Sequence, residues 1–284
     1  MITQIFGTNN ALLYPYVQLI LKENIGKKYF FINEEEWKLR MDESINQGNK
    51  IFWLELLNRV HFCSITNLLR TQKWIDALTL SFENQNLLSF CTSMRGLIEF
   101  ATDSYYTFAA IPYHLADIFS EIESIFDTEK KEIVINQALE DALLHYTFAG
   151  KHRKKDNRSK IYNAKQIKDY IKYADESGKI QALYEHLSGF THPSTESVTS
   201  FLKIQKHEIG EYLEVIDQDE ETILKLVKNN QKLFDNILCL SIYPSLFNLK
   251  ILSMFKIENF KSKSINSLNF DQLTIWKDIK SKIK

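Results

Sequence analysis

The chain has 284 residues, and its 35 Lys and Arg against 36 Asp and Glu give a formal net charge of -1. A chain of this length buries enough surface to fold without disulfides or metal ions. The balanced charge excludes a strong overall attraction to nucleic acid or anionic lipid, so such binding would need a local patch. The three cysteines, Cys63, Cys91 and Cys239, lie far apart and predict reduced core thiols.

The sequence carries no signal for export or for membrane insertion. No basic residue precedes Lys22, so the charged start of a signal peptide is missing. The uncharged run over residues 236–249 contains Pro244 and is shorter than the ~20 apolar residues that span a bilayer. We therefore expect a cytoplasmic protein that does not engage a membrane.

The low content of helix breakers, 8 Gly and 4 Pro, together with apolar residues at helical spacing predicts an all-α chain. Asn33 ahead of three glutamates predicts that a helix starts there. Gly48 is expected to interrupt this helix. Gly189 is expected to end another helix. Helices are predicted over residues 51–70 with a continuation over 74–82, then over 84–110, 115–126, 130–149, 164–176, 180–188 and 217–240, with shorter ones after Pro244 and Asn269.

The segment after Pro193 has two interpretations. Ser194 can cap a further helical turn, whereas the alternation of the residues near 198–216 also fits a short β-hairpin around Gly210. No repeat and no linker rich in Pro, Gly or Ser divides the chain. We therefore predict an all-α fold, a single multi-helix bundle over residues 1–284. In it, N-terminal helices over 1–83 pack on a core bundle over 84–240, followed by C-terminal helices over 241–284.

A helix with very few charges carries the first candidate site. Arg95, Glu99 and Asp103 are its only charged residues between Asn84 and Pro112, and helical spacing aligns them in one stripe that Tyr106 continues. Buried charges must be paired or face a wet cavity. Two interpretations stay open: Arg95 clamps Glu99 for structural reasons, or Arg95 holds an anion while Glu99 orients a partner or acts as a base.

The stretch "YEHLSGFTHPS" carries the second candidate site. Tyr184 and Ser188 share one helical face, and His192 follows directly before Pro193. A residue before proline favours an extended conformation, so His192 is expected to leave the helix. It either stabilises a turn or acts as a general acid or base, because the ordinary pKa of a histidine lies near neutrality.

Two further features have a structural and a functional interpretation. His145 either is a satisfied core histidine or faces a site. The segment "GKHRKKDNRSK", residues 150–160, is either a solvated connection or a local basic patch for the phosphates of RNA or of a nucleotide. Its basic residues include Lys151, Arg153, Lys154 and Lys155. No spacing of histidines, no glycine-rich loop and no serine elbow indicates a metal or a cofactor, so we expect neither.

These motifs carry a resemblance to known families. The pattern is Arg-x3-Glu at Arg95 and Glu99, then Tyr-x3-Ser-x3-His-Pro-Ser at Tyr184, Ser188, His192, Pro193 and Ser194. It resembles a group of uncharacterised bacterial helical proteins over roughly residues 50–240, a likeness that implies no established reaction. More distantly, the chain is similar to HEPN domains, helical proteins of toxin–antitoxin and antiviral defence systems.

The likeness to HEPN domains implies a metal-independent ribonuclease, with an active site often formed across a dimer. Such sites pair an arginine with a histidine four to six residues later. None of the six arginines of this chain has a histidine at that spacing. Arg95 and His192 would therefore have to meet through the fold.

Three functions are compatible with the sequence. The first is a metal-independent ribonuclease or nucleotide-processing protein of a bacterial defence or stress system, with Arg95, Glu99, Tyr184 and His192 as catalytic residues. The second is a non-catalytic sensor or binding module for a small anionic ligand. The third is a partner-binding structural protein, and a homodimer is compatible with each.

Overall fold

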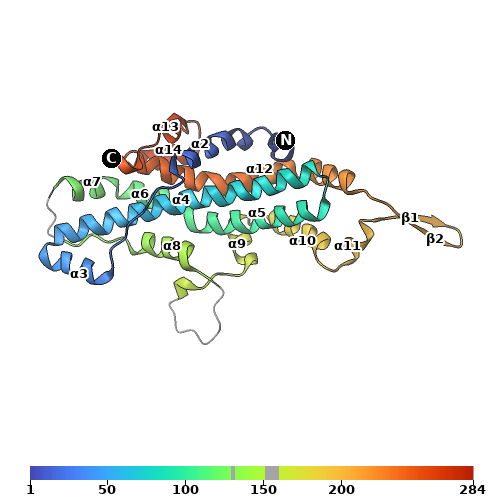
Figure 1. Ribbon diagram of the computed structural model, residues 1–284, viewed down its shortest axis with the longest axis horizontal. Helices are drawn as coiled ribbons and strands as arrows, with labels where there is room; N and C mark the ends of the chain where they lie inside the picture. Colours follow the sequence, from blue (N-terminus) through green and yellow to red (C-terminus); the bar gives the residue numbers. More distant parts are fainter. Residues whose placement is uncertain (129–131, 151–159, 284) are drawn as a thin grey trace. The chain divides into compact units, whose positions relative to one another are not determined.

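The structure is a computed structural model that describes residues 1–128, 132–150 and 160–283. It is all-α with one small antiparallel hairpin, which confirms the predicted fold class (Figure 1). Among the described residues, none of the helices has the length and apolar character needed to cross a membrane.

The helices and strands take up most of the described chain. The α-helices are α1 Ile2–Phe6, α2 Tyr14–Asn24, α3 Glu34–Glu43, α4 Ile45–Glu83, α5 Leu87–Phe108, α6 Ile111–Asp117, α7 Phe119–Asp127, α8 Gln137–Phe148, α9 Ile167–Ala174, α10 Lys179–Thr191, α11 Thr195–Thr199, α12 Asp219–Leu252, α13 Lys263–Ser267 and α14 Thr274–Lys282. The 3₁₀ turns are η1 Asn10–Leu13, η2 Lys160–Tyr162 and η3 Glu258–Phe260, and the strands are β1 Leu202–His207 and β2 Gly210–Val215.

The chain divides into two compact units, each assembled from separate segments. Unit 1 consists of Met1–Tyr14, Arg70–Asp103 and Gln166–Ser241. Unit 2 consists of Pro15–Leu69, Ser104–Lys165 and Ile242–Lys284. The segments of the two units alternate along the sequence, and the single domain over residues 1–284 stays a prediction.

In unit 1, apolar side chains of α4, α5, α10 and α12 form the core. Phe90 on α5 and Phe234 on α12 are fully buried, with ring centroids 6.4 Å apart. Gly96 of α5 lies against Trp74 of α4 so closely that a Cβ at this glycine would overlap the indole ring. The N-terminal segment joins the same core, since the Tyr14 hydroxyl donates a 2.7 Å hydrogen bond to Asp76 of α4.

In unit 2, aromatic side chains connect segments that lie far apart in the sequence. Phe247 of α12 stacks on Trp276 of α14, with ring centroids 5.6 Å apart. Phe119 of α7 stacks on Phe255 at 4.2 Å. The fully buried Trp53 of α4 donates its indole N–H to the carbonyl of Val134 at 2.9 Å.

Asparagine side chains cap the starts of two helices. The Asn33 side chain accepts the amide of Glu36 at 2.8 Å, which confirms the predicted start of α3. Helix α8 begins only at Gln137, because Asn136 caps it by accepting the amide of Leu139. The prediction of a helix from residue 130 was therefore wrong over 132–136, and residues 129–131 lie outside the described part of the chain.

Two predicted helix interruptions are absent. Helix α3 ends before Ser44, and Gly48 lies inside α4, where its missing Cβ leaves room for the side chain of Met41. Pro244 lies inside α12, which continues to Leu252. Proline removes one backbone hydrogen bond, but the fully buried Ile242 and Leu246 on either side show that core packing holds this part of the helix.

The segment around Pro193 contains both a helix and the hairpin. Ser194 caps α11 in a capping box with Ser197, as expected. Strands β1 and β2 pair from Leu202 opposite Val215 to His207 opposite Gly210, which confirms the hairpin. The turn lies at residues 208 and 209, and Gly210 begins β2.

Candidate functional site

Helices α5 and α10 bring three of the predicted catalytic residues together in unit 1. The Tyr184 hydroxyl of α10 donates a 2.6 Å hydrogen bond to Glu99 Oε1 of α5. Arg95 Nη2, one helical turn before Glu99, donates to the same hydroxyl at 3.1 Å. Tyr184 therefore bridges the two charged residues, in place of the direct Arg95–Glu99 clamp that one interpretation of the sequence required.

A fourth residue, Thr191, completes this cluster. Arg95 Nη1 donates a 2.7 Å hydrogen bond to the Thr191 hydroxyl, and the guanidinium carbon lies 4.9 Å from the centre of the Tyr184 ring. Thr191 follows Tyr184 by seven residues, so both lie on the face of α10 that meets α5. The helical spacing was visible in the sequence, but the nearby His192 drew the interpretation away from it.

The residues of this cluster are half-buried, and the positive charge of Arg95 is not paired directly with a carboxylate in the described part of the chain. Hydroxyl groups, and no carboxylate of the described residues, contact the Arg95 guanidinium directly. Its Nε atom is buried and has no hydrogen-bond partner among the described residues. Burial, and next the hydrogen bond to Glu99, raise the pKa of Tyr184, so its hydroxyl stays protonated as a donor.

The remaining predicted residues of α10 have local roles in the structure. The Ser188 hydroxyl donates to the Tyr184 carbonyl at 2.7 Å, a bond within the helix. Gly189 was expected to end the helix, but α10 continues to Thr191 because the chain leaves helical geometry only at the residue before Pro193.

His192 has the extended backbone expected of it, with φ -110° and ψ 158°. Its side chain is exposed, and its ring makes no hydrogen bond, ion pair or ring contact with any part of the chain that the structure describes. It directly follows Thr191, the partner of Arg95. The structure therefore places His192 next to the cluster in sequence but records no side-chain contact with it.

Two other predicted residues lie together in unit 2. The rings of Tyr106 and His145 meet edge to face with centroids 6.0 Å apart, and the Lys165 ammonium lies 4.3 Å above the Tyr106 ring. His145 Nδ1 is 2.8 Å from the carbonyl oxygen of Ile161. These contacts give His145 the satisfied environment of a structural histidine. Asp103, by contrast, belongs to the α5 segment of unit 1 and is half-buried.

The predicted basic patch cannot be placed. The basic residues assigned to it, Lys151, Arg153, Lys154 and Lys155, all lie outside the described residues.

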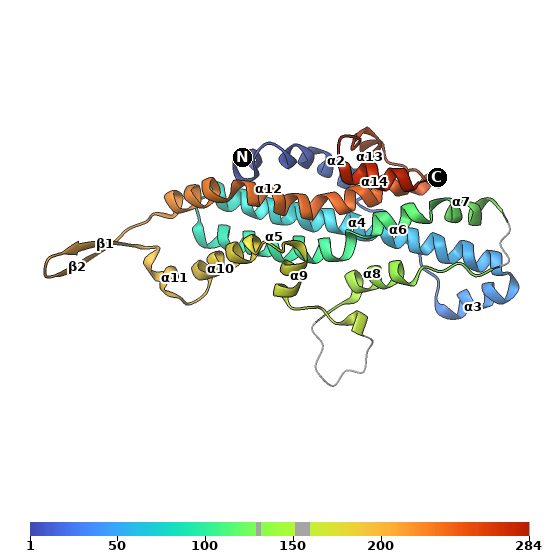
Figure 2. The same cartoon turned by 180° about the vertical axis from the view of Figure 1, so that it is seen from behind.

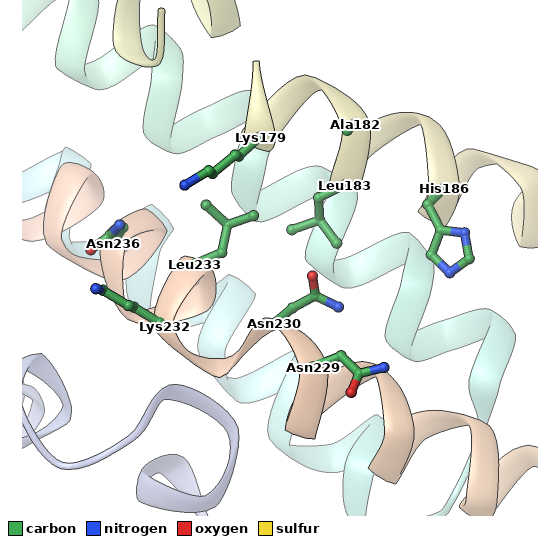
Figure 3. Close-up of a pocket in the computed structure, with 9 residues that line it drawn as sticks. All are labelled: Lys179, Ala182, Leu183, His186, Asn229, Asn230, Lys232, Leu233 and Asn236. Atoms are coloured by element: carbon green, nitrogen blue, oxygen red, sulfur yellow. The ribbon is translucent and has the colours of Figure 1, made fainter. Parts of the chain in front are cut away.

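A cavity that the sequence analysis did not identify lies on another side of α10, where this helix faces α12 within unit 1 (Figure 3). Its volume is about 480 Å³, within the usual range for small-molecule sites. Its lining residues are Lys179, Ala182, Leu183, His186, Asn229, Asn230, Lys232, Leu233 and Asn236. No carboxylate is among the described residues that line it.

The lining residues are distributed unevenly along this cavity. In Figure 3, Lys179, Lys232 and Asn236 lie toward one end, and His186, Asn229 and Asn230 lie toward the other. Leu183 and Leu233 lie between them. The cavity therefore combines a cationic end, an apolar middle and an end that carries two amides and an imidazole.

A signal for this cavity was present in the stretch "KNNQKLFDN", residues 228–236. It carries three asparagines and a lysine at spacings that repeat along one side of a helix. Only the packing of α10 against α12 turns that side into a cavity wall.

No group of three or more side chains that could hold a metal ion converges in the described part of the chain.

Comparison of the chain with known protein families, curated proteins and solved structures gave no match. The interpretation of function therefore rests on the geometry of unit 1 alone.

Proposed function

We propose that unit 1 is a binding module for a small anionic ligand, and that the ligand occupies the cavity between α10 and α12. The observation that carries this proposal is the lining of the cavity. Two lysines, three asparagines and a histidine line it, without a carboxylate among the described residues. Such a lining attracts negative charge and supplies amide groups that fix its orientation.

The arrangement of these groups indicates the kind of ligand. Lys179 and Lys232 are both exposed, so their ammonium groups can rearrange around a phosphate or carboxylate at the cationic end. Leu183 and Leu233 offer an apolar surface to the body of the ligand. We expect a small molecule with one anionic group and a partly apolar body, such as a nucleoside monophosphate or an aromatic carboxylic acid.

The side chains, rather than the N-terminus of α10, are expected to hold the anion. Asp175 already accepts the amide of Ile180 at 2.8 Å and the amide of Ser177 at 3.0 Å. This carboxylate occupies the position at the helix start where an anion would otherwise bind.

Thermal unfolding with a panel of anions tests the proposal. The probes are inorganic phosphate, a nucleoside monophosphate and benzoate, each at millimolar concentration. A bound probe raises the free energy of unfolding by about 2.7 kcal/mol when its concentration is 100 times Kd. Lys232→Ala is expected to abolish the shift. Lys228→Ala removes the same charge from α12 one turn away, outside the cavity lining. This control variant is expected to retain the thermal shift.

The absence of a shift with every probe would contradict the proposal. So would a shift that Lys228→Ala and Lys232→Ala reduce equally, because the attraction would then come from the general charge of α12.

A second candidate is the HEPN-like function, a metal-independent ribonuclease or nucleotide-processing protein of a bacterial defence or stress system. The observation that favours it is the hydrogen bond from Arg95 to Thr191, the residue directly before the exposed His192. In this proposal Arg95 stabilises phosphate charge and His192 transfers a proton. The basic residues of the sequence segment 150–160 are a further feature that favours a substrate with phosphates.

Incubation of the protein with RNA in the presence of a chelator tests this second candidate. The wild type is expected to cleave, and His192→Ala and Arg95→Ala are expected to lose activity. His207→Ala, which changes another exposed histidine of unit 1, serves as the matched control. Equal activity or equal inactivity of the wild type, His192→Ala and Arg95→Ala would eliminate the ribonuclease.

A further inference from the structure

The β1–β2 hairpin extends beyond α11 and the start of α12 in unit 1 (Figures 1 and 2). Every residue from Lys203 to Val215 is exposed. A two-stranded hairpin is marginally stable in water unless one of its faces packs against something. The isolated hairpin therefore raises the question of what covers it.

The register of the hairpin separates its side chains into two different faces. Leu202 lies opposite Val215, and Ile204 lies opposite Leu213. Since side chains alternate along a strand, these four residues share one face. Ile204 is 47 % exposed, Leu213 62 % and Val215 82 %, so this apolar face has no covering layer among the described residues.

The opposite face is polar and has its own contacts. It carries Gln205 opposite Tyr212, and the Tyr212 ring meets the His207 ring edge to face at 5.9 Å. Exposed apolar side chains that gather on one face and not the other indicate a binding surface.

The two strands carry opposite charges. Strand β1 contains Lys203 and Lys206, whereas β2 contains Glu214 and Glu211 directly opposite them. A partner of uniform charge would be attracted by one strand and repelled by the other. A partner whose charges are themselves split between two adjacent strands would be attracted by both.

A second copy of the chain is such a partner, because it also carries lysines on β1 and glutamates on β2. Two hairpins can be related by a two-fold axis that runs parallel to their strands, with their apolar faces toward each other. In this arrangement β1 of one copy lies over β2 of the other. Lys206, which shares the apolar face, then meets Glu211 of the second copy, and the same pair forms again by symmetry. Leu and Ile side chains of both copies fill the space between the two sheets, which pack about 10 Å apart.

We propose that two copies of this chain associate through the apolar face of the β1–β2 hairpin, with β1 of each copy facing β2 of the other. A two-fold arrangement closes on itself, whereas pairing of the outer edge of β1 with the outer edge of β2 would continue into an open polymer. Side-by-side pairing of two β1 edges would place lysines near lysines. The face-to-face dimer avoids both problems.

Sedimentation equilibrium on the full chain tests this dimer. The wild type is expected to be dimeric at about 100 µM, a concentration that populates even a complex of micromolar Kd. Leu213→Glu places a charge on the apolar face and is expected to weaken association by at least about tenfold. Tyr212→Glu makes the same change at the neighbouring residue on the polar face and is expected to leave association unchanged. The helical circular dichroism of both variants should match the wild type, because no described helix contains either residue.

Charge variants test the orientation. Lys206→Glu and Glu211→Lys each place like charges opposite one another, so each variant alone is expected to be mostly monomeric. An equimolar mixture of the two is expected to form a heterodimer, because each copy then meets opposite charges across the interface. The cross-strand pair within each hairpin stays disrupted in the mixture, so only contact between copies explains the recovery.

Three results would overturn the proposal. They are a monomeric wild type at the highest concentration, equal weakening by Leu213→Glu and Tyr212→Glu, and a mixture that behaves as the average of its two components. A monomer that retains the ligand-induced thermal shift would leave the binding module intact, so the two proposals fail separately.

Discussion

The Tyr184 hydroxyl donates a 2.6 Å hydrogen bond to Glu99 Oε1 and accepts one from Arg95, so a single phenol joins two opposite charges on a neighbouring helix. The bond joins residues 85 positions apart in the chain. Together with the hydrogen bond from Arg95 to Thr191, it couples α10 to α5.

Tyr184→Phe is expected to lower the free energy of unfolding by about 1–2 kcal/mol, because it leaves Arg95 Nη2 and Glu99 Oε1 without this partner in a half-buried site. Urea unfolding followed by circular dichroism measures the change. Tyr16→Phe, which removes a hydroxyl from a 38 % exposed tyrosine, is the matched control and is expected to have little effect. Equal stability of the two variants would show that the bridge contributes nothing.

Stability is expected to decrease in mild acid because of His61. This residue of α4 is 3 % exposed, its Nδ1 lies 2.7 Å from the Tyr29 hydroxyl, and burial lowers its pKa to about 3. Below the unfolded pKa of about 6.5, the unfolded chain binds a proton that the folded chain does not, so stability falls as the pH falls toward 3. The loss amounts to about 2 kcal/mol at about pH 5.

Denaturant unfolding of the wild type and of His61→Asn between about pH 7.5 and about pH 5 measures this contribution. The variant is expected to lose stability overall but to show a shallower pH dependence. Parallel pH profiles for His61→Asn and the wild type would contradict the prediction.

The three cysteines are expected to resist thiol reagents in the folded protein. Burial raises the pKa of Cys63 and of Cys91 to about 12 and that of Cys239 to about 11. At about pH 8 the reactive thiolate is therefore at least about a hundredfold less populated than in an unfolded chain. Titration with Ellman's reagent should be slow in buffer and should reach all three thiols in denaturant. Rapid modification of any thiol in the folded state would show that its helix opens locally.

Two glycine variants are expected to change stability in opposite directions. Gly96→Ala would push a Cβ into the Trp74 ring and is expected to cost about 1–3 kcal/mol. Gly189 lies inside α10, and a Cβ at this position would meet the Glu196 side chain at ordinary contact distances. Gly189→Ala is therefore expected to raise the free energy of unfolding by up to about 1 kcal/mol through helix propensity. Urea unfolding of the two variants measures both effects, and a destabilised Gly189→Ala would indicate that this position needs glycine for another reason.

Local signals in the sequence determined the helical class and several element boundaries. Asn33 and Ser194 cap helices as predicted. His192 has the extended conformation expected of a residue directly before a proline. These features depend on residues within a few positions of one another, so the local sequence contains the interaction that determines them.

The site was only partly visible. The sequence identified Arg95, Glu99 and Tyr184, because charges on an apolar helix and a polar face on another are local patterns. It did not identify Thr191 as the partner of Arg95, and the separation of Arg95 and Tyr184 by 89 residues leaves their hydrogen bond to the fold. The cavity between α10 and α12 was not predicted either, because its walls come from two helices that the hairpin separates in the chain.

The sequence by itself determined that the chain is helical, where several helices start and that a hairpin fits near residue 210. Tertiary structure alone decided that α12 continues through Pro244, that Gly48 lies inside a helix, and that α10 meets both α5 and α12 around polar side chains. The physical reason is the range of the interactions. Caps and helical periodicity act between neighbours in sequence, whereas core packing adds contacts between distant segments, and these can outweigh the cost of a proline or a glycine within a helix.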